Sequence, residues 1–285
     1  MTSIENKVDF AGVVVVKNAN PNGDPLNGNR PRLTYEGLGE ISDVCLKRKI
    51  RNRVLEKEHG IFVQSDDYKV DDYPSLSKRA DGELSKEATK DKGKLIQESC
   101  EKWFDVRAFG QLFAFSGKGK DKGVSVGIRG PVSIHSAFSV LPVNASSLQI
   151  TKSVSSEGDG SKRGSDTMGM KHRVDHGVYV FYGSINPQLA TKTGFSRDDA
   201  EILKEALISI FENDASSARP EGSMELNKLV WWEHNNPSGQ YSSAKVHRSL
   251  KVEPREGIAD PKDIDDYSIR VGEMEGLSAE MIDGK

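Results

Sequence analysis

The chain has 285 residues, of which 35% are hydrophobic and 29% charged, and its net charge is −3. This length fits one large domain with insertions or two small domains. The longest apolar run, Phe10 to Val16, is far shorter than the ~18 residues that span a bilayer, so no membrane partner is expected. The first nine residues contain Glu5 and Asp9 and no apolar signal-peptide core, and we expect a cytoplasmic protein.

The negative charge is concentrated at one end of the chain. Residues 253–285 hold ten acidic and four basic side chains, so this acidic C-terminal segment carries −6 and the rest of the chain +3. The mildly basic remainder permits nucleic-acid binding without demonstrating it. Two isolated cysteines, Cys45 and Cys100, are too few for a disulfide framework or a zinc site, and no metal or other cofactor is predicted.

The N-terminal part of the chain predicts a strand, a turn and a helix. Phe10 to Val16 is a β-branched run typical of a central strand buried on both faces. The Asn- and Pro-rich stretch from Asn18 to Pro25 then indicates a turn. A helix is predicted from Ser42, a suitable N-cap, to about Lys57, because apolar residues recur every fourth position.

Further elements follow a polar stretch from Ser65 to Lys94 that we interpret as an insertion. The pattern predicts a helical segment at Leu95–Trp103, strands at Val124–Ile128, Val132–Leu141 and Val178–Ile185, a helix from Ser196 to about Asn213, and a final strand at Leu226–Trp232. Without the insertion, the order is strand, helix, strands, helix, strand. This order favours an α+β fold with a ferredoxin-like, RNA-recognition-motif (RRM)-like core, although other α+β layouts share it.

The first predicted helix carries five basic residues within seven positions. They are Lys47, Arg48, Lys49, Arg51 and Arg53, and only one acid, Asp43, lies nearby. Because Leu46 and Ile50 occupy the buried face, we expect these bases to fan around the exposed part of the helix, where a phosphate backbone would meet several cations. The alternative is a solvated helix face, but such faces usually alternate in sign.

Two loop segments are further candidates for RNA contact. The loop before the helix supplies the amides of Asn20 and Asn22 and the guanidinium groups of Arg30 and Arg32, or it is an ordinary connection. The stretch 167–173 places methionines beside cations, so that an exposed methionine could wedge between bases. The alternative is that these methionines fill gaps in the core.

Catalytic patterns are weaker. His172, Asp175 and His176 could suggest a metal site, but residues four apart in a strand are separated by ~13 Å. Neither glycine-rich piece, 117–123 or 158–164, has the Gly-Lys-Ser/Thr of a phosphate loop. We therefore predict no metal site and no catalytic residue.

Several segments together resemble the backbone subunits of the CRISPR interference complex Cascade, within the RAMP superfamily, and are most similar to the type I-C branch. The segments, which span roughly Val8 to Trp232, are Asn20–Pro25, Asn29–Arg32, Ile41–Arg51, Asp105–Gly110, Gly130–Val132 and Thr167–His172. The resemblance implies a single RRM-like palm over residues 1–285, with fingers inserted at about 61–104 and a thumb at about 145–173. Copies would stack along one CRISPR RNA (crRNA), held by the basic helix and its preceding loop, while the thumb flips guide bases out.

The resemblance also implies the partners and the site. The partners are crRNA, target DNA through the guide, neighbouring copies, a guide-processing cap subunit, a large target-recognition subunit and a recruited helicase-nuclease. The expected RNA-binding residues are Asn20, Asn22, Arg30, Arg32, Ser42, Lys47, Arg48, Lys49, Arg51, Arg107, Met168, Met170, Lys171, His172 and Arg173.

Two other functions stay open from the sequence. One is an endoribonuclease of the same superfamily, because type III relatives cut RNA with a thumb-loop aspartate and Asp159 and Asp166 lie in a comparable region, near His172 and His176. The other is a protein scaffold that binds no RNA.

Overall fold

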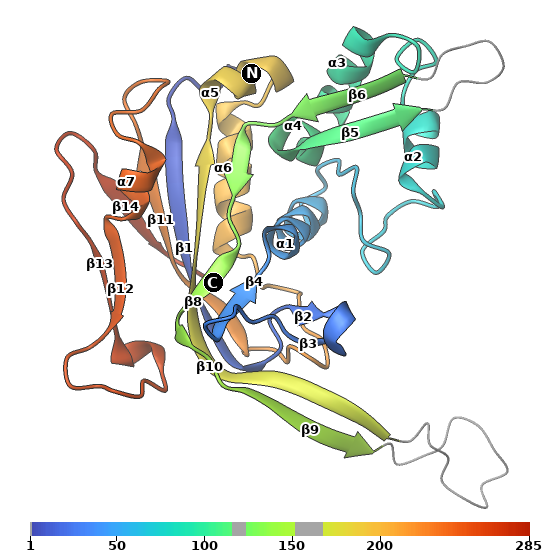
Figure 1. Cartoon of the computed structure of the whole chain (residues 1–285). Helices are drawn as coiled ribbons and strands as arrows, with labels where there is room; N and C mark the ends of the chain where they lie inside the picture. Colours follow the sequence, from blue (N-terminus) through green and yellow to red (C-terminus); the bar gives the residue numbers. More distant parts are fainter. Residues whose placement is uncertain (1, 116–123, 152–167) are drawn as a thin grey trace, which may run out of the picture.

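The computed structural model describes residues 2–115, 124–151 and 168–285. Within them, one antiparallel sheet of eight strands forms the centre of the molecule (Figure 1). Its strands are β1 (Val8–Ala19), β4 (Leu38–Ile41), β7 (Val132–Ile134), β8 (Ala137–Pro142), β9 (Ala145–Thr151), β10 (Met168–Ile185), β11 (Met224–Glu233) and β14 (Ala279–Asp283). The α+β class predicted from the sequence is confirmed.

The middle of this sheet has the predicted split β-α-β arrangement. Strands β11, β1, β10 and β8 lie side by side in that order, and β1 pairs with β10 and β11 along almost its whole length. Helices α1 (Asp43–Glu56) and α6 (Arg197–Ile208) pack together against one face of the sheet (Figure 1). The connection order and the two helices on one face are those of a ferredoxin-like core.

The predicted central strand is buried on both faces because each face has its own cover. From Val8 to Val16, no residue of β1 is more than 8% exposed. Side chains that alternate along β1 enter two hydrophobic clusters: Phe10 and Val14 face the helices, whereas Val13 and Val15 face the other side. On that second side lie helix α7 (Ser243–His247) and a hairpin of β12 (Leu250–Pro254) and β13 (Tyr267–Val271) (Figure 1).

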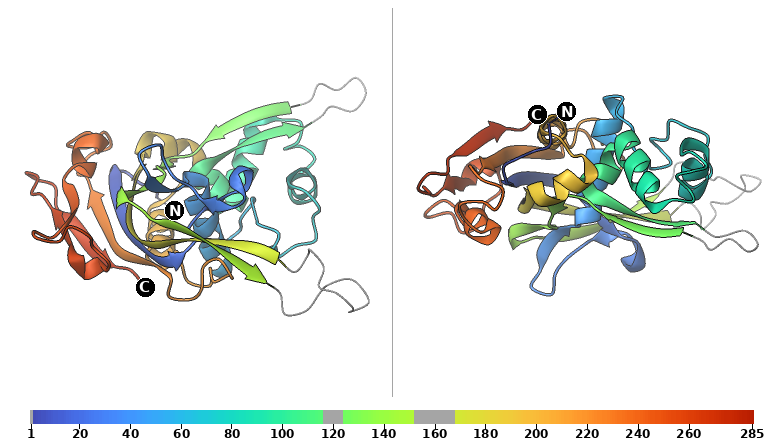
Figure 2. Two further views of the ribbon diagram at one scale, coloured as in Figure 1. Left: turned by 60° about the horizontal axis from the view of Figure 1, so that its bottom comes forward. Right: turned by 90° about the horizontal axis from the view of Figure 1, so that it is seen from above.

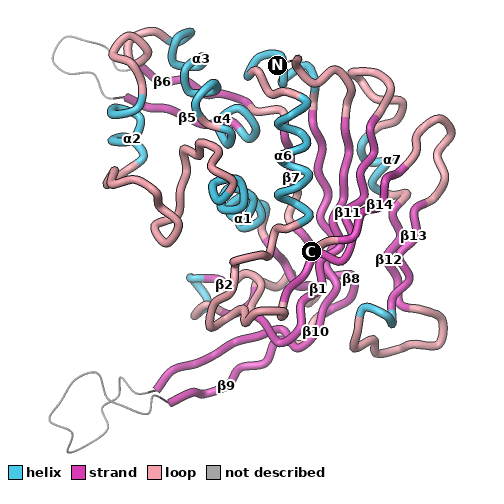
Figure 3. The backbone as a smooth tube through the Cα atoms, turned by 180° about the vertical axis from the view of Figure 1, so that it is seen from behind, coloured by secondary structure: helices cyan, strands magenta, loops and turns pink. Residues whose placement is uncertain are grey.

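A second lobe has a separate hydrophobic cluster, whose members run from Phe62 to Ile128. It contains α2 (Leu76–Glu83), α3 (Lys92–Lys102), α4 (Phe104–Phe109), β5 (Gly110–Phe115) and β6 (Val124–Arg129). Phe62, Trp103 and Phe113 pack ring against ring at its centre. The lobe and the β9–β10 hairpin both project from the same side of the main sheet, with α1 between them (Figures 1 and 3).

Three predictions of element boundaries are wrong. The strand predicted at Val132–Leu141 is two strands, β7 and β8, because the register of pairing with β10 shifts by one residue between Ile134 and Phe138. The helix predicted to reach Asn213 ends at Ile208, beyond which the chain continues as turns. The strand at Leu226–Trp232 is not the last, since β14 in the acidic C-terminal segment pairs with β11. The remaining short elements are β2 (Gly23–Asp24), β3 (Arg30–Pro31), α5 (Pro187–Thr193) and the 3-10 helices η1 (Pro25–Asn27) and η3 (Ile264–Asp266).

Candidate nucleic-acid interface

The loop that follows β1 is fixed to the first turn of α1. Ser42 is the N-cap of the helix, and its hydroxyl accepts a hydrogen bond from the Cys45 amide at 3.3 Å. The Ser42 amide and hydroxyl both donate to Oδ1 of Asn22, at 2.9 and 2.8 Å. Asn20 is buried, and its side-chain amide donates to the Asn29 carbonyl at 2.7 Å. Asn20, Asn22 and Ser42 therefore hold the loop in shape, which the sequence did not reveal.

The expectation that all five bases of α1 lie on its exposed part is wrong for Lys49 and Arg53. The Lys49 ammonium is buried and paired with Asp214, and burial lowers the pKa of Lys49 while Asp214 opposes that shift. Arg53 is also buried, where it contacts Glu56 and Glu212. These two bases attach α1 to the segment that follows α6, because an unpaired buried charge would be strongly unfavourable.

The other three bases of α1 differ in how accessible they are. Arg51 donates to the buried carboxylate of Asp105 at 2.9 Å, and the same carboxylate accepts from the amides of Phe62 and Val63. Lys47 is paired with Asp43 at 2.9 Å. Arg48 is exposed and makes no ion pair or hydrogen bond with any residue the structure describes. Arg48 is thus the base of α1 that is freest to meet a phosphate.

Arg30 and Arg32 line a cavity of about 320 Å³ between the β2–β3 loop and strand β9. Ser146 and Ser147 form the side of the cavity that belongs to β9. Arg30 is exposed, while Arg32 lies 3.6 Å from the carboxylate of Asp24. The buried Nε of Arg32 has no hydrogen-bond partner among the described residues. Because buried donors nearly always have an acceptor in proteins, this nitrogen is available to a ligand atom that enters the cavity.

The β9–β10 hairpin exposes apolar side chains on both faces. Met168 and Met170 are 63% and 54% exposed, so the alternative that they fill the core is wrong. Residues directly opposite each other share a face of an antiparallel pair. Ile150 lies opposite Gly169 and Leu148 opposite Lys171, which places these two apolar residues on the face that the methionines do not occupy. This second apolar face was not predicted from the sequence, although the alternation of β9 could have indicated it.

The cations and the histidine of this hairpin divide between the same two faces. His172 follows the methionines on their face and is 8% exposed, with its Nδ1 2.8 Å from the Ser147 hydroxyl. Lys171 and Arg173 lie on the other face, and Arg173 is 3.5 Å from Asp175. Lys171 has no ion pair within the described part of the chain. The hairpin therefore combines exposed apolar groups with cations, as surfaces that bind single-stranded nucleic acids do.

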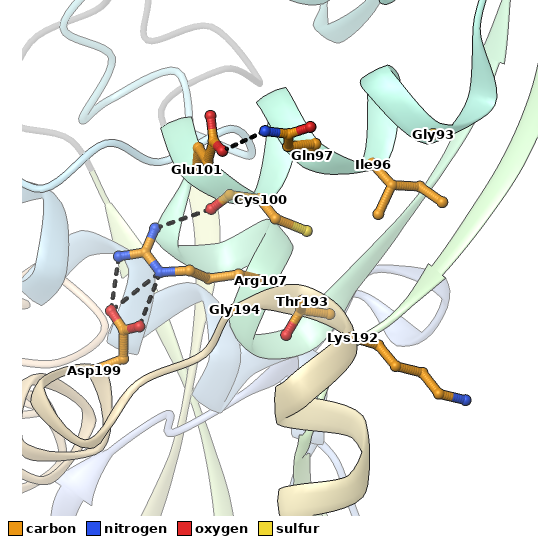
Figure 4. Close-up of a pocket in the computed structure, with 10 residues that line it drawn as sticks. All are labelled: Gly93, Ile96, Gln97, Cys100, Glu101, Arg107, Lys192, Thr193, Gly194 and Asp199. Atoms are coloured by element: carbon orange, nitrogen blue, oxygen red, sulfur yellow. Dashed lines mark hydrogen bonds and ion pairs between the residues drawn. The ribbon is translucent and has the colours of Figure 1, made fainter. Parts of the chain in front are cut away.

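Arg107 lies away from these residues, on α4 of the second lobe, where it faces Asp199 of α6 (Figure 4). Its guanidinium makes a two-point contact with Asp199, with nitrogen–oxygen distances of 2.7 to 3.1 Å, and donates to the Cys100 carbonyl. Asp199 in turn closes the capping box of α6 with Ser196. The arginine forms one wall of a cavity of about 540 Å³ between α3, α4 and α5. The structure thus gives Arg107 a role in joining the two lobes that the sequence did not suggest.

The described ranges contain no group of three side chains arranged to hold a metal ion. His172 and His176 lie in the extended β10 strand, and burial lowers the pKa of His176. Asp159 and Asp166, on which the nuclease alternative depends, lie outside the described residues. None of the helices in the described ranges is long and apolar enough to cross a membrane.

Comparisons with known proteins point to one family. Residues 6–272 match the family model of CRISPR-associated protein Cas7. A CRISPR-associated protein Cas7 of Haloferax volcanii is 26% identical over 230 residues, which are 76% of this chain and 67% of that protein. Among solved structures, a chain of a CRISPR RNA-guided surveillance complex has a TM-score of 0.47 at 16% identity, covering 89% of this chain and 78% of that one. A chain of a pre-nicking CRISPR RNA-guided surveillance complex has a TM-score of 0.44 at 12% identity, with 79% and 78% covered.

Proposed function

The chain belongs to the family of CRISPR-associated protein Cas7, and from this premise we propose that it is a non-catalytic, crRNA-binding backbone subunit of a type I Cascade complex, of the I-C branch. In this proposal the main sheet is the palm, the second lobe the fingers and the β9–β10 hairpin the thumb. Several copies line one guide, and the guide pairs with target DNA. The other partners are the cap subunit that processes the guide, the large target-recognition subunit and a recruited helicase-nuclease.

The surface between the second lobe and the β9–β10 hairpin supports this proposal most directly. Arg48 of α1, Arg30 of the loop and Lys171 of the hairpin carry charges that no described residue neutralises. The exposed side chains of Leu148 and Ile150 lie on the hairpin face that carries Lys171. Cations beside exposed apolar groups fit a single-stranded RNA, because the cations can hold its phosphates while the apolar side chains contact its bases. The sequence of the target is then read by base pairing with the guide, not by the protein.

The environment of the histidines supports a non-catalytic role. His172 is almost fully buried and its Nδ1 is engaged by Ser147, so the ring is poorly placed to exchange a proton with an RNA phosphate. A cleavage assay with guide precursor and with complementary RNA, with and without magnesium, tests this point. Discrete products that disappear in a His172→Ala or Asp166→Ala variant would instead support the endoribonuclease.

The test of RNA binding compares two exposed arginines. Arg48 and Arg248 are both exposed and have no side-chain partner among the described residues, but Arg248 is the C-cap of α7, on the face of the sheet opposite α1. Arg48→Glu should weaken binding of a single-stranded RNA and reduce the slope of log K against log salt by ~0.7 for each phosphate that the variant no longer neutralises. Arg248→Glu should leave both unchanged. Equal losses of affinity in the two variants would contradict the proposed interface.

A further inference from the structure

One strand edge in the C-terminal part of the protein is unpaired beside an open part of the main sheet. Within the described residues, β12 pairs with β13 and with no other strand. A cavity of about 420 Å³ separates β12 from β8 and β10. Four consecutive residues of β12, 250–253, line one wall of this cavity. Successive side chains of a strand point to opposite faces, so a run of four residues along one wall is what a strand edge presents.

The hydrogen bonds at the end of the hairpin show which backbone groups face the cavity. The Gly272 amide donates to the Ser249 carbonyl at 2.9 Å, and the Arg255 amide donates to the Asp266 carbonyl at 2.8 Å, so Ser249 and Arg255 both occupy hydrogen-bonded positions opposite their partners. Because such pairs alternate along antiparallel strands, every second residue of β12 after Ser249 bonds towards β13. Val252 lies between two such residues, and its amide and carbonyl therefore point away from β13, into the cavity.

The floor of the cavity is apolar. Phe138 of β8 is 42% exposed, and its neighbours Val140, Val180 and Tyr182 are half-buried. Phe138 and Val180 lie opposite each other in the β8–β10 pair, so they share a face of the sheet. This is the face that α7, β12 and β13 cover elsewhere. At β8 the cover ends, and an apolar surface is left next to a free strand edge. Figure 2 shows the C-terminal segments, in orange and red, on one side of the main sheet.

The charges at the rim favour a protein partner over a nucleic acid. Lys251 is exposed without an ion pair among the described residues, and Glu253 is paired with Arg270 at 3.2 Å. One unpaired cation is too little positive charge to attract a polyanion. A cross-strand acidic residue opposite Lys251 would complement the one unpaired charge.

We propose that this groove binds an extended segment of a partner protein, which adds to β12 as a third strand. The main chain of the segment pairs with the amide and carbonyl of Val252, and its alternate side chains are apolar and contact Phe138 and Tyr182. An acidic side chain on its outer face lies opposite Lys251. Strand addition of this kind takes its affinity from main-chain hydrogen bonds and its specificity from the pockets beneath alternate side chains.

The test is a selection from displayed random peptides of about nine residues against the purified full chain. The selection is repeated against Val252→Pro, which removes the outward amide while leaving the bonds to β13, and against Phe138→Ser. The matched control is Leu112→Ser in β5, because Leu112 is 67% exposed on the second lobe. Thermal melting of each variant checks that it is folded.

We expect enriched peptides that alternate apolar residues with an acidic one. They should bind at least ~10-fold more weakly to Val252→Pro and Phe138→Ser, a loss of ~1.4 kcal/mol, and normally to Leu112→Ser. Lys251→Glu should shift the selection towards basic residues. Enrichment that Val252→Pro does not reduce, or no enrichment at all, would overturn the proposal. So would binding of a deoxythymidine oligonucleotide that Phe138→Ser abolishes, which would assign the groove to nucleic acid.

Discussion

The buried lysine of α1 should contribute to stability rather than to RNA binding. The Lys49 side chain is 1% exposed and that of its partner Asp214 is 11% exposed. Breaking a buried ion pair costs ~3–5 kcal/mol, because the remaining charge is left without a partner. In Lys49→Met, Asp214 keeps Arg219 at 3.0 Å, so we expect the lower end, a loss of ~3 kcal/mol. At ~2–4 °C per kcal/mol, Tm should fall by ~6–12 °C.

Thermal unfolding of Lys49→Met beside Lys57→Met measures this difference. The control removes Lys57, the C-cap of the same helix, whose ion pair with Glu205 is exposed: 34% and 63% of the two side chains are accessible. Its loss should cost less than ~1 kcal/mol. Below its Tm, Lys49→Met should bind RNA like the unaltered protein. A Tm no lower than that of Lys57→Met would refute the assignment of Lys49 to the core. Failure of a fully folded Lys49→Met to bind RNA would refute its exclusion from the interface.

Three further perturbations have defined outcomes. The double variant Met168→Ser and Met170→Ser should weaken RNA binding ~10-fold in a fluorescence titration, a loss of ~1.4 kcal/mol, because the methionines would no longer wedge between bases. An unchanged Kd would contradict contact between the methionines and the bases. Gly130→Ala places a Cβ 2.3 Å from the Ala108 carbonyl and should lower the free energy of unfolding by ~1–3 kcal/mol, whereas Gly127→Ala, with its nearest atom at 4.0 Å, should not. Burial lowers the pKa of His247 in the folded protein. Its contribution to stability is therefore complete above pH ~6.5, the unfolded-state pKa, and is lost as the pH falls through the lowered folded-state pKa. In urea unfolding at several pH values, the free energy of unfolding should decline less steeply towards low pH in His247→Gln than in the unaltered protein.

The local patterns of the sequence predicted those elements whose stability is determined locally. The run at Phe10–Val16 and the cap at Ser42 both appear in the structure, because β-branched residues and a capping hydroxyl act on their own backbone. The capping box of Ser196 and Asp199 is also present. These features depend on neighbours within a few positions along the chain.

The environment of each basic residue could not be predicted in this way. Lys49 is buried because Asp214, 165 positions away, supplies its counter-charge, and Arg107 is held by Asp199, 92 positions away. Neither partner can be identified from the composition of the helix. The same reason explains why the sequence patterns predicted no strand in the acidic C-terminal segment: β14 is specified by pairing with β11, and β12 and β13 by pairing with each other.

The distribution of paired and unpaired charges limits what one copy of the protein can do with RNA. Two of the five bases on α1 hold the fold together, and a third is bound to Asp105. Among the residues that the structure describes, Arg48, Arg30 and Lys171 are cations of this region without an ion pair. Three phosphate contacts correspond to a salt slope of about −2 per copy, which gives weak binding at physiological salt. Tight and length-defined binding then requires several copies on one strand, because each bound copy raises the effective concentration of the next site. A single chain whose salt slope is much steeper than about −2 would show that cations other than these three also neutralise phosphates.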